Sequence, residues 1–337
     1  MKSSVFLATG TKGLARAEGQ DDDWTVTHLL SGVRINCLAV DPLDRRQIYA
    51  GTQENGVLCS SDWGQSWQPT GLSGLTVKSL AVSSHRRGLL YAGTKPAYLY
   101  TSADGGATWT ELSGFRQVPG RWKWLSPAEW PFQAYVQAIA LSPTDSDVLL
   151  AGIEAGAVVR SDDGGHTWSG HRAGADRDCH SMTFHATDGD WIYEGGGGGP
   201  AVSQDGGRSW HHPTEGLDGR YCWACAGDPQ RPEVWYVSAA PMIVWPNIFA
   251  FPTAHYDGKA NAAIYRRSGG ASWQKLQGGL PQPLDYMAYS LLTDPAAPGH
   301  LYAGLSNGDV WHSSDYGEGW LHLPFNLGGI HRQLIRI

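Results

Sequence analysis

Four side chains able to exchange protons stand beside short apolar runs in the middle of the sequence. Asp178 and His180 come just before one such run, and Glu154 and Glu194 come near the ends of others. Two carboxyl groups placed across a glycosidic bond can hydrolyse it, and a histidine is the commonest general base. These residue types therefore allow a glycoside hydrolase or a lyase, provided that the fold brings them together.

A second group of side chains occupies one fixed place, two residues before an apolar run that recurs along the chain. The seven residues there are Asn36, Lys78, Gln137, His180, Trp223, Tyr289 and Arg332, and two residues further back stand Arg34 and Tyr221. Every repeat has a different residue at this place, and most are polar. Differing polar groups that converge on one point are typical of a site for an asymmetric ligand. The alternative is the water-filled mouth of a channel.

The chemistry of these positions mixes cations, aromatic rings and carboxylates. An arginine fork suits carboxylate recognition, and flat rings suit sugar faces. Connections between the apolar runs add further polar residues to the same rim, namely Gln53, Glu54, Lys95, Arg172, Arg177, His211, His212 and Arg220. We expect a small carboxylated or hydroxylated molecule, a glycan or a segment of a partner protein to bind here.

The elements that position these residues follow from an internal repeat. The pattern Ser-x-Asp-x-Gly-x-x-Trp occurs five times, at 60–67, 102–109, 161–168, 203–210 and 313–320. A weaker copy lies at 266–273, and a remnant that keeps the Trp lies at 17–24. Before most boxes come two apolar runs joined by a polar turn, as in 38–52 and 80–94. Short apolar runs bounded by Gly, Pro, Asp and Asn indicate strands, and four strands in each of several repeats indicate the blades of a β-propeller.

The two ends of the chain complete the ring. Residues 333–337 resemble a first strand without a successor, and residues 5–10 resemble a second strand without a predecessor. Pairing them closes the propeller and removes an exposed sheet edge. The sequence therefore predicts an all-β fold, a single domain over 1–337, with seven four-stranded antiparallel blades closed by the N- and C-terminal strands.

The aspartates of the five boxes have a structural interpretation. Asp and Ser side chains accept backbone N–H bonds in tight turns, and Gly supplies the positive φ angle. We therefore expect Asp62, Asp104, Asp163, Asp205 and Asp315 to stabilise turns rather than to act in catalysis or calcium binding. The Trp of each box is expected to fill the layer between blades.

The five boxes resemble the Asp-box, or BNR, repeat of sialidases, sortilin-type receptors, xyloglucanases and the photosystem II assembly factor family. The resemblance implies the propeller fold. Arg34-Ile35-Asn36 matches only part of the Arg-Ile-Pro motif of sialidases, which have six blades. Xyloglucanases use two facing propellers, and this chain supplies one. The resemblance to the assembly factors implies a chaperone or partner-binding role.

Two repeats are longer than the others. Their insertions, 115–135 and 240–262, fall in connections that an antiparallel blade places on the face opposite the boxes. The first carries Trp122, Trp124 and Trp130, and the second carries Trp245, Phe249, His255 and Tyr256. Binding residues concentrate on variable loops of a rigid scaffold, so each insertion is either a lid or a packed loop.

Composition excludes some classes of function. The formal net charge is −7, whereas a nucleic-acid-binding protein usually has a basic surplus. The most apolar stretch, 239–251, contains two prolines and is too short to span a bilayer. The five cysteines show no framework spacing, and no secretory signal is visible, so we expect a cytoplasmic protein. Cys222-x-x-Cys225 has no second pair and is interpreted as two small core residues rather than a redox or zinc half-site.

We expect no cofactor and no metal. His180, His211, His212 and Glu194 could supply ligands, but no His-Glu-x-x-His type of spacing supports them. The sequence favours a non-catalytic binding propeller, a monomer or weak homodimer, with a polar central pocket. The alternative is a propeller enzyme that uses Glu154, Glu194, Asp178 and His180.

Overall fold

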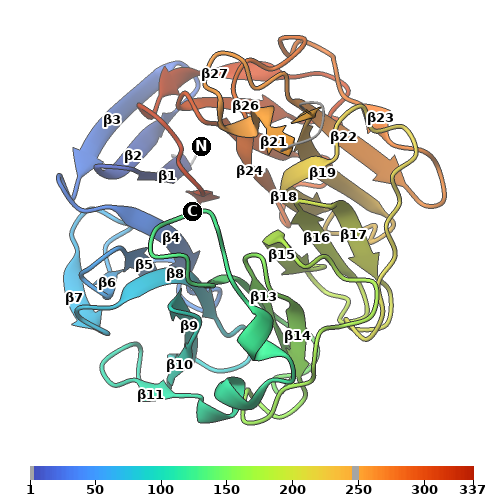
Figure 1. Ribbon diagram of the computed structural model, residues 1–337. Coiled ribbons are helices and arrows are strands. Elements are labelled where there is room, and N and C mark those ends of the chain that lie inside the picture. The colour runs from blue at the N-terminus through green and yellow to red at the C-terminus, as the bar shows by residue number, and fades with distance from the viewer. Residues whose placement is uncertain (1–3, 245–249) are drawn as a thin grey trace.

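The repeated apolar runs form the strands of seven antiparallel sheets arranged as a ring (Figure 1). The computed structural model describes residues 4–244 and 250–337. Each sheet is one blade, and the first strand of each blade lies nearest the axis. The predicted all-β, seven-bladed propeller is confirmed.

Five blades have four strands, as predicted. Blade 1 consists of β28 (Leu334–Arg336), β1 (Ser4–Gly10), β2 (Gly13–Gln20) and β3 (Asp23–Leu29). Blade 2 consists of β4 (Ile35–Val40), β5 (Ile48–Thr52), β6 (Val57–Ser60) and β7 (Gln68–Gly71). Blade 3 consists of β8 (Thr76–Val82), β9 (Leu90–Lys95), β10 (Leu99–Ser102) and β11 (Thr110–Glu111). Blade 6 consists of β18 (Tyr221–Gly227), β19 (Val234–Ala240), β22 (Ala263–Ser268) and β23 (Gln274–Lys275). Blade 7 consists of β24 (Ala288–Thr293), β25 (Leu301–Leu305), β26 (Asp309–Ser313) and β27 (Leu321–Asn326).

The outer strand is reduced in the other two blades. Blade 4 has β12 (Val136–Leu141), β13 (Leu149–Ile153) and β14 (Val158–Ser161), and blade 5 has β15 (Cys179–Phe184), β16 (Ile192–Gly196) and β17 (Gly199–Ser203). The fourth segment is held there by isolated bonds, from Ser169 N to the Arg160 carbonyl in blade 4 and between Val202 and His211 in blade 5. The segments 169–178 and 212–220 are rich in Gly and charged residues, which do not form the alternating apolar pattern of a long strand.

The ends of the chain pair within blade 1. In the antiparallel register of β1 and β28, Leu7 lies opposite Ile335. Val5 and Ile337 continue the pairing beyond the assigned strand. Figure 1 shows the C-terminal end near the centre of the ring. The predicted closure is confirmed, and it leaves no open sheet edge between the first and last blades.

A glycine in the second strand allows neighbouring blades to approach closely. A Cβ atom at Gly93 would lie 2.6 Å from the Cβ atom of Val136 in the next blade. Gly51 has the same relation to Val77, at 2.7 Å from a side-chain methyl carbon. The recurrent Ala-Gly of the repeat thus follows from the packing of blade against blade.

The boxes form tight turns between the third and fourth strands. In the box of blade 3, Asp104 accepts hydrogen bonds from the Ser102 hydroxyl and from the backbone and side chain of Thr108. The backbone N–H of Gly105 donates to the Gly88 carbonyl, which joins the box to the turn between the first two strands. Trp109 donates to the carbonyl of Thr70 in blade 2. The other four boxes repeat the bond between the Ser hydroxyl and the Asp carboxylate.

Both insertions contain short 3₁₀ turns. The first has η1 (Ser113–Gln117), which begins just before it, and η2 (Arg121–Lys123). The second has η3 (Thr253–His255) and the hairpin of β20 (Met242–Val244) and β21 (Ala250–Pro252). The first insertion runs from the rim toward the centre of the ring (Figure 1). Among the described residues, no helix is both long and apolar enough to cross a membrane.

Candidate functional site

Six inner strands carry a β-bulge at the place where the repeat puts its variable residue. In β8, Val77 and Ser79 pair with two consecutive residues of β9, so Lys78 between them is left out of the ladder. The same shift leaves out Asn36, Gln137, His180 and Tyr289 in their strands, and Trp223 with Ala224 in β18. A bulge bends the strand and redirects a side chain.

The seven variable side chains meet on the axis of the propeller. They line one cavity of about 230 Å³, to which the inner strands of all seven blades contribute. Arg332, just before β28, reaches across this axial cavity, and its Nη1 donates to the Gln137 side-chain oxygen at 2.7 Å. The structure thus brings the ring residues together, while their use by a ligand stays a prediction.

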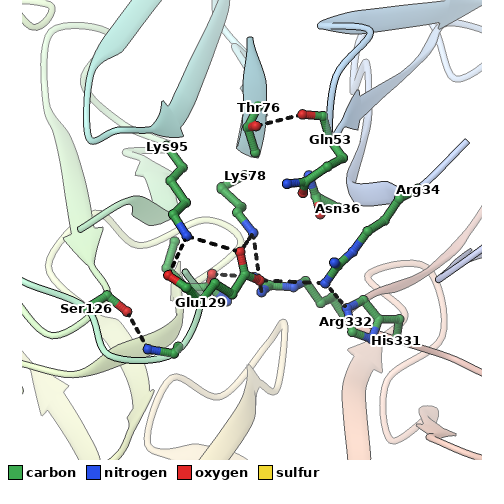
Figure 2. Close-up of polar contacts among 12 residues, drawn as sticks. Arg34, Asn36, Gln53, Thr76, Lys78, Lys95, Ser126, Glu129, His331 and Arg332 are labelled. Atoms are coloured by element: carbon green, nitrogen blue, oxygen red, sulfur yellow. Dashed lines mark hydrogen bonds and ion pairs between the residues drawn. The ribbon is translucent and has the colours of Figure 1, made fainter. Parts of the chain in front are cut away.

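Glu129 of the first insertion lies at the mouth of the axial cavity among four cations (Figure 2). Its carboxylate accepts two hydrogen bonds from Lys78 Nζ, at 2.7 and 2.9 Å, and one from Arg332 at 3.2 Å. Lys95 Nζ and Arg34 Nη2 lie 3.5 and 3.6 Å from its oxygens. We call Arg34, Lys78, Lys95 and Arg332 the cationic group. The aromatic face of Tyr135 lies beneath Lys78 Nζ, 4.8 Å from the ring centre.

Burial and charge shift the pKa values of this group strongly. Burial and the nearby charge of Arg332 lower the pKa of Lys78 to about 8, although Glu129 opposes the shift. Partial burial raises the pKa of Glu129, but its bonds and charge interactions with Lys78 and Arg332 outweigh burial and bring it to about 2. The cationic group therefore holds a carboxylate in its charged form.

Aromatic side chains form another wall of the mouth. His255 of the second insertion bridges two tyrosines, because Nε2 lies 2.9 Å from the Tyr221 hydroxyl and Nδ1 lies 2.9 Å from the Tyr289 hydroxyl. Trp223 packs edge-on against His255 and stacks on His180, with ring centres 4.7 Å apart. Trp245 and Phe249 of the same insertion lie outside the described residues.

Glu154, Asp178 and His180 converge between the cationic group and the aromatic wall. One ligand atom from each residue lies within 4.8 Å of the other two, and we call these three residues the acid–histidine cluster. His180 Nε2 lies 3.5 Å from an Asp178 oxygen. Burial lowers the pKa of His180, but Asp178 and Glu154 outweigh burial and leave it raised. Burial, partly offset by His180, raises the pKa of Glu154 to about 7.

Glu194, expected from the sequence to join this cluster, lies elsewhere. It is fully buried in β16, where its Oε2 atom accepts a hydrogen bond from Asp176 N, and burial raises its pKa to about 8.

The structure likewise does not bring together the histidines that the sequence offered as metal ligands. His211 pairs with Val202 in the outer part of blade 5, and His212 contacts the Gly174 carbonyl. Cys222 and Cys225 are buried free thiols.

Sequence reasoning missed Glu129, the side chain that organises the mouth. It lies in an irregular stretch without periodicity, and its only signal was its place within a long insertion. The same insertion exposes large apolar side chains, with Trp122 84% and Trp130 82% exposed. Lys95 was noted only as a rim residue, whereas the structure puts it 3.5 Å from the Glu129 carboxylate.

Comparisons with solved structures agree with the fold. An ancestral GH74 enzyme is 17% identical in sequence to this chain, with a TM-score of 0.64. The match covers 99% of this chain and 40% of the enzyme chain. This chain therefore spans less than half of that enzyme. YCF48 from Cyanidioschyzon merolae is 13% identical, with a TM-score of 0.59, and the match covers 89% of this chain and 88% of the YCF48 chain. YCF48 bound to D1 peptide is 16% identical over 86% and 81%, with a TM-score of 0.54. At these identities the likeness shows the fold alone.

The comparison with curated proteins gives no match. A family model described as the DUF6242 beta propeller domain matches residues 2–218, which is more than half of the chain. The chain therefore belongs to the DUF6242 beta propeller family.

Proposed function

We propose that this protein is a binding module that recognises a carboxylate-bearing ligand at the mouth of its axial cavity. The observation that carries the proposal is the set of four cations around the single Glu129 carboxylate. Arg34, Lys78 and Arg332 come from or directly precede the inner strands of three different blades, and all three side chains converge on this one carboxylate. A carboxylate supplied by a ligand would satisfy the same donors.

The position of the Glu129 carboxylate shows where the carboxylate of a ligand would bind. Lys78 is fully buried, so its ammonium group needs an anionic partner in the folded protein. The aromatic wall of Tyr221, Trp223 and Tyr289 offers flat surfaces and hydroxyls beside that anion site. A ligand that combines a carboxylate with a hydroxylated ring would use both walls.

The carboxylate belongs either to a small molecule or to a protein segment. YCF48, which shares the fold, has been solved with a D1 peptide bound, and this supports a segment as one source. The exposed tryptophans of the first insertion support it as well, because exposed apolar residues around a polar site are typical of protein contacts.

Matched pairs of probes test the proposal by isothermal titration calorimetry. Glucuronate differs from glucose by its carboxylate, and a short peptide with a free C-terminus differs from its amide in the same way. We expect saturable binding of the charged member of at least one pair and none of its neutral partner. Equal binding of both members, or binding of neither, would refute the proposal.

Variants locate the site. Lys95→Gln and Arg332→Gln should each weaken binding of the charged probe by about tenfold or more, since each removes a charge-assisted contact. Arg86→Gln is the matched control, because Arg86 is exposed in the turn between β8 and β9, away from the cavity lining. Loss of binding in Arg86→Gln would place the site elsewhere.

A second candidate is a propeller enzyme, a glycoside hydrolase or lyase. It is favoured by the convergence of two carboxyl groups and an imidazole within 4.8 Å. Glu194 would take no part, because it is fully buried in β16, where its Oε2 atom accepts a hydrogen bond from Asp176 N. Incubation with aryl glycosides and with uronate-containing oligosaccharides tests it. Turnover that is lost in Glu154→Gln would establish an enzyme, whereas no turnover would leave the binding module.

We also propose that the protein works in a reducing compartment, the cytoplasm. All five cysteines are free thiols, and four of them are buried. Fractionation of cells that express the tagged native chain, followed by thiol labelling of the denatured protein, tests this, since oxidised cysteines or recovery outside the cytoplasm would contradict it.

A further inference from the structure

The acid–histidine cluster has an unsatisfied arrangement of hydrogen-bond acceptors. His180 Nδ1 lies 2.6 Å from the Cys222 carbonyl, which can only accept, so Nδ1 carries the proton. In the neutral ring Nε2 then has a lone pair. This atom is buried and has no hydrogen-bond partner among the described residues, and it faces the Asp178 carboxylate at 3.5 Å.

The two carboxylates of the cluster add to the same imbalance. Glu154 is only 8% exposed, and one of its carboxylate oxygens lies within 4.8 Å of ligand atoms of Asp178 and His180. Asp178 uses Oδ1 to accept from Ala155 N at 3.3 Å, which leaves Oδ2 toward His180. One oxygen of each carboxylate and the imidazole nitrogen thus lie within 4.8 Å of one another. A cation at this point would satisfy all three.

We propose that Glu154, Asp178 and His180 form a binding site for one divalent transition-metal ion at the mouth of the axial cavity. The donor set of one imidazole and two carboxylates suits Mn²⁺, Fe²⁺ or Zn²⁺ better than Mg²⁺ or Ca²⁺, which prefer oxygen ligands alone. Three protein ligands leave coordination positions open for water or for a ligand.

The surroundings of His180 are those of a metal ligand. A hydrogen bond from Nδ1–H to a backbone carbonyl fixes the tautomer and directs Nε2 to a metal. The ring is held by Trp223 stacked on it and by Tyr221 packed at 4.7 Å, so the imidazole is fixed before an ion arrives. Glu154 and His180 come from adjacent blades, and the ion would join them.

The test uses the full chain after treatment with EDTA and dialysis. Titration with MnCl₂ is followed by calorimetry and by loss of the electron paramagnetic resonance signal of free Mn²⁺, because Mn²⁺ avoids the five thiols that Zn²⁺ could bind. We expect one ion per chain, and weaker binding of Mg²⁺. His180→Gln and Glu154→Gln should each lower Mn²⁺ affinity by about 100-fold, since each removes a ligand rather than a supporting bond. Circular dichroism shows whether each variant folds.

His211→Gln is the matched control, because the exposed side chain of His211 lies in the outer part of blade 5, outside the cluster, and this variant should bind Mn²⁺ as the native protein does. Absence of saturable binding up to about 1 mM Mn²⁺, or undiminished binding in folded Glu154→Gln, would overturn the proposal. The inference is independent of carboxylate recognition, since Lys95→Gln should weaken glucuronate binding and leave Mn²⁺ binding unchanged.

Discussion

The Glu129→Gln variant should be less stable than the native protein and yet bind carboxylates more tightly. The substitution keeps the size of the side chain and removes its charge. Lys78, which is fully buried, and three further cations then lose their common anion. The same cations become available to a ligand that brings its own carboxylate.

The size of both effects follows from the pKa of Glu129. Its fall from 4.5 to about 2 in the folded protein corresponds to about 3 kcal/mol of stabilisation at neutral pH. This is an upper value, because Lys78 can lose its proton once its partner is gone. For a chain of 337 residues, we therefore expect the melting temperature of Glu129→Gln to fall by up to about 4 °C. Removing a tethered competitor worth up to about 3 kcal/mol should increase the affinity for glucuronate by between about 10-fold and 100-fold.

The dependence on pH provides an internal check. Because the folded pKa of Glu129 lies below its ordinary value, the stabilisation is present above pH 4.5 and is lost as the pH falls from 4.5 to about 2. The difference in melting temperature between the native protein and Glu129→Gln should therefore shrink toward about pH 3. Calorimetric melting at several pH values and titration with glucuronate at neutral pH measure the two effects.

Glu318→Gln is the control, since Glu318 pairs with Arg266 at the surface and is 57% exposed. Its loss should cost less than about 1 kcal/mol and leave binding unchanged. Unchanged stability of Glu129→Gln would refute the electrostatic reasoning. Weaker glucuronate binding in Glu129→Gln would show that Glu129 helps to hold the ligand rather than occupying its place.

Three further predictions concern pH, packing and the boxes. Glucuronate affinity should fall as the pH rises through about 8, the value to which burial lowers the pKa of Lys78, and a flat calorimetric profile from pH 7 to about 9 would contradict this. Gly93→Ala should destabilise the protein by about 1–3 kcal/mol in urea unfolding, because the new Cβ meets Val136 at 2.6 Å; Gly270→Ala, with open space around it, should cost less, and equal losses would refute the packing argument. Asp205→Ala should lower stability by roughly 1 kcal/mol, after allowance for solvent exposure, because four hydrogen bonds of its box turn lose their acceptor; loss of glucuronate binding at unchanged melting temperature would refute its structural role.

The ring positions show how far a repeat can be followed from sequence to site. Because each blade repeats the same strand order, equivalent positions such as Lys78 and His180 had to lie around one axis, and the structure places both on one cavity. The β-bulge that turns these side chains inward was not predictable from spacing. It depends on how one strand pairs with its neighbour.

Glu154 and Glu194 show where that approach ends. Glu154 comes directly after β13 and lies near His180, whereas Glu194 stands within β16 and is buried against Asp176 N. A shift of one residue along a strand sends a side chain to the other face of the sheet. Repeat alignment to within a residue or two could not decide between these outcomes.

The sequence alone determined the all-β class, seven blades and closure of the ring through 5–10 and 333–337, because these depend on local patterns of apolar residues, turn residues and box tryptophans repeated many times. Only the tertiary structure decided that the fourth strand is reduced in blades 4 and 5 and that Glu129 meets the cationic group. The path of an irregular insertion depends on the sum of many weak contacts with distant residues, and no local pattern records that sum.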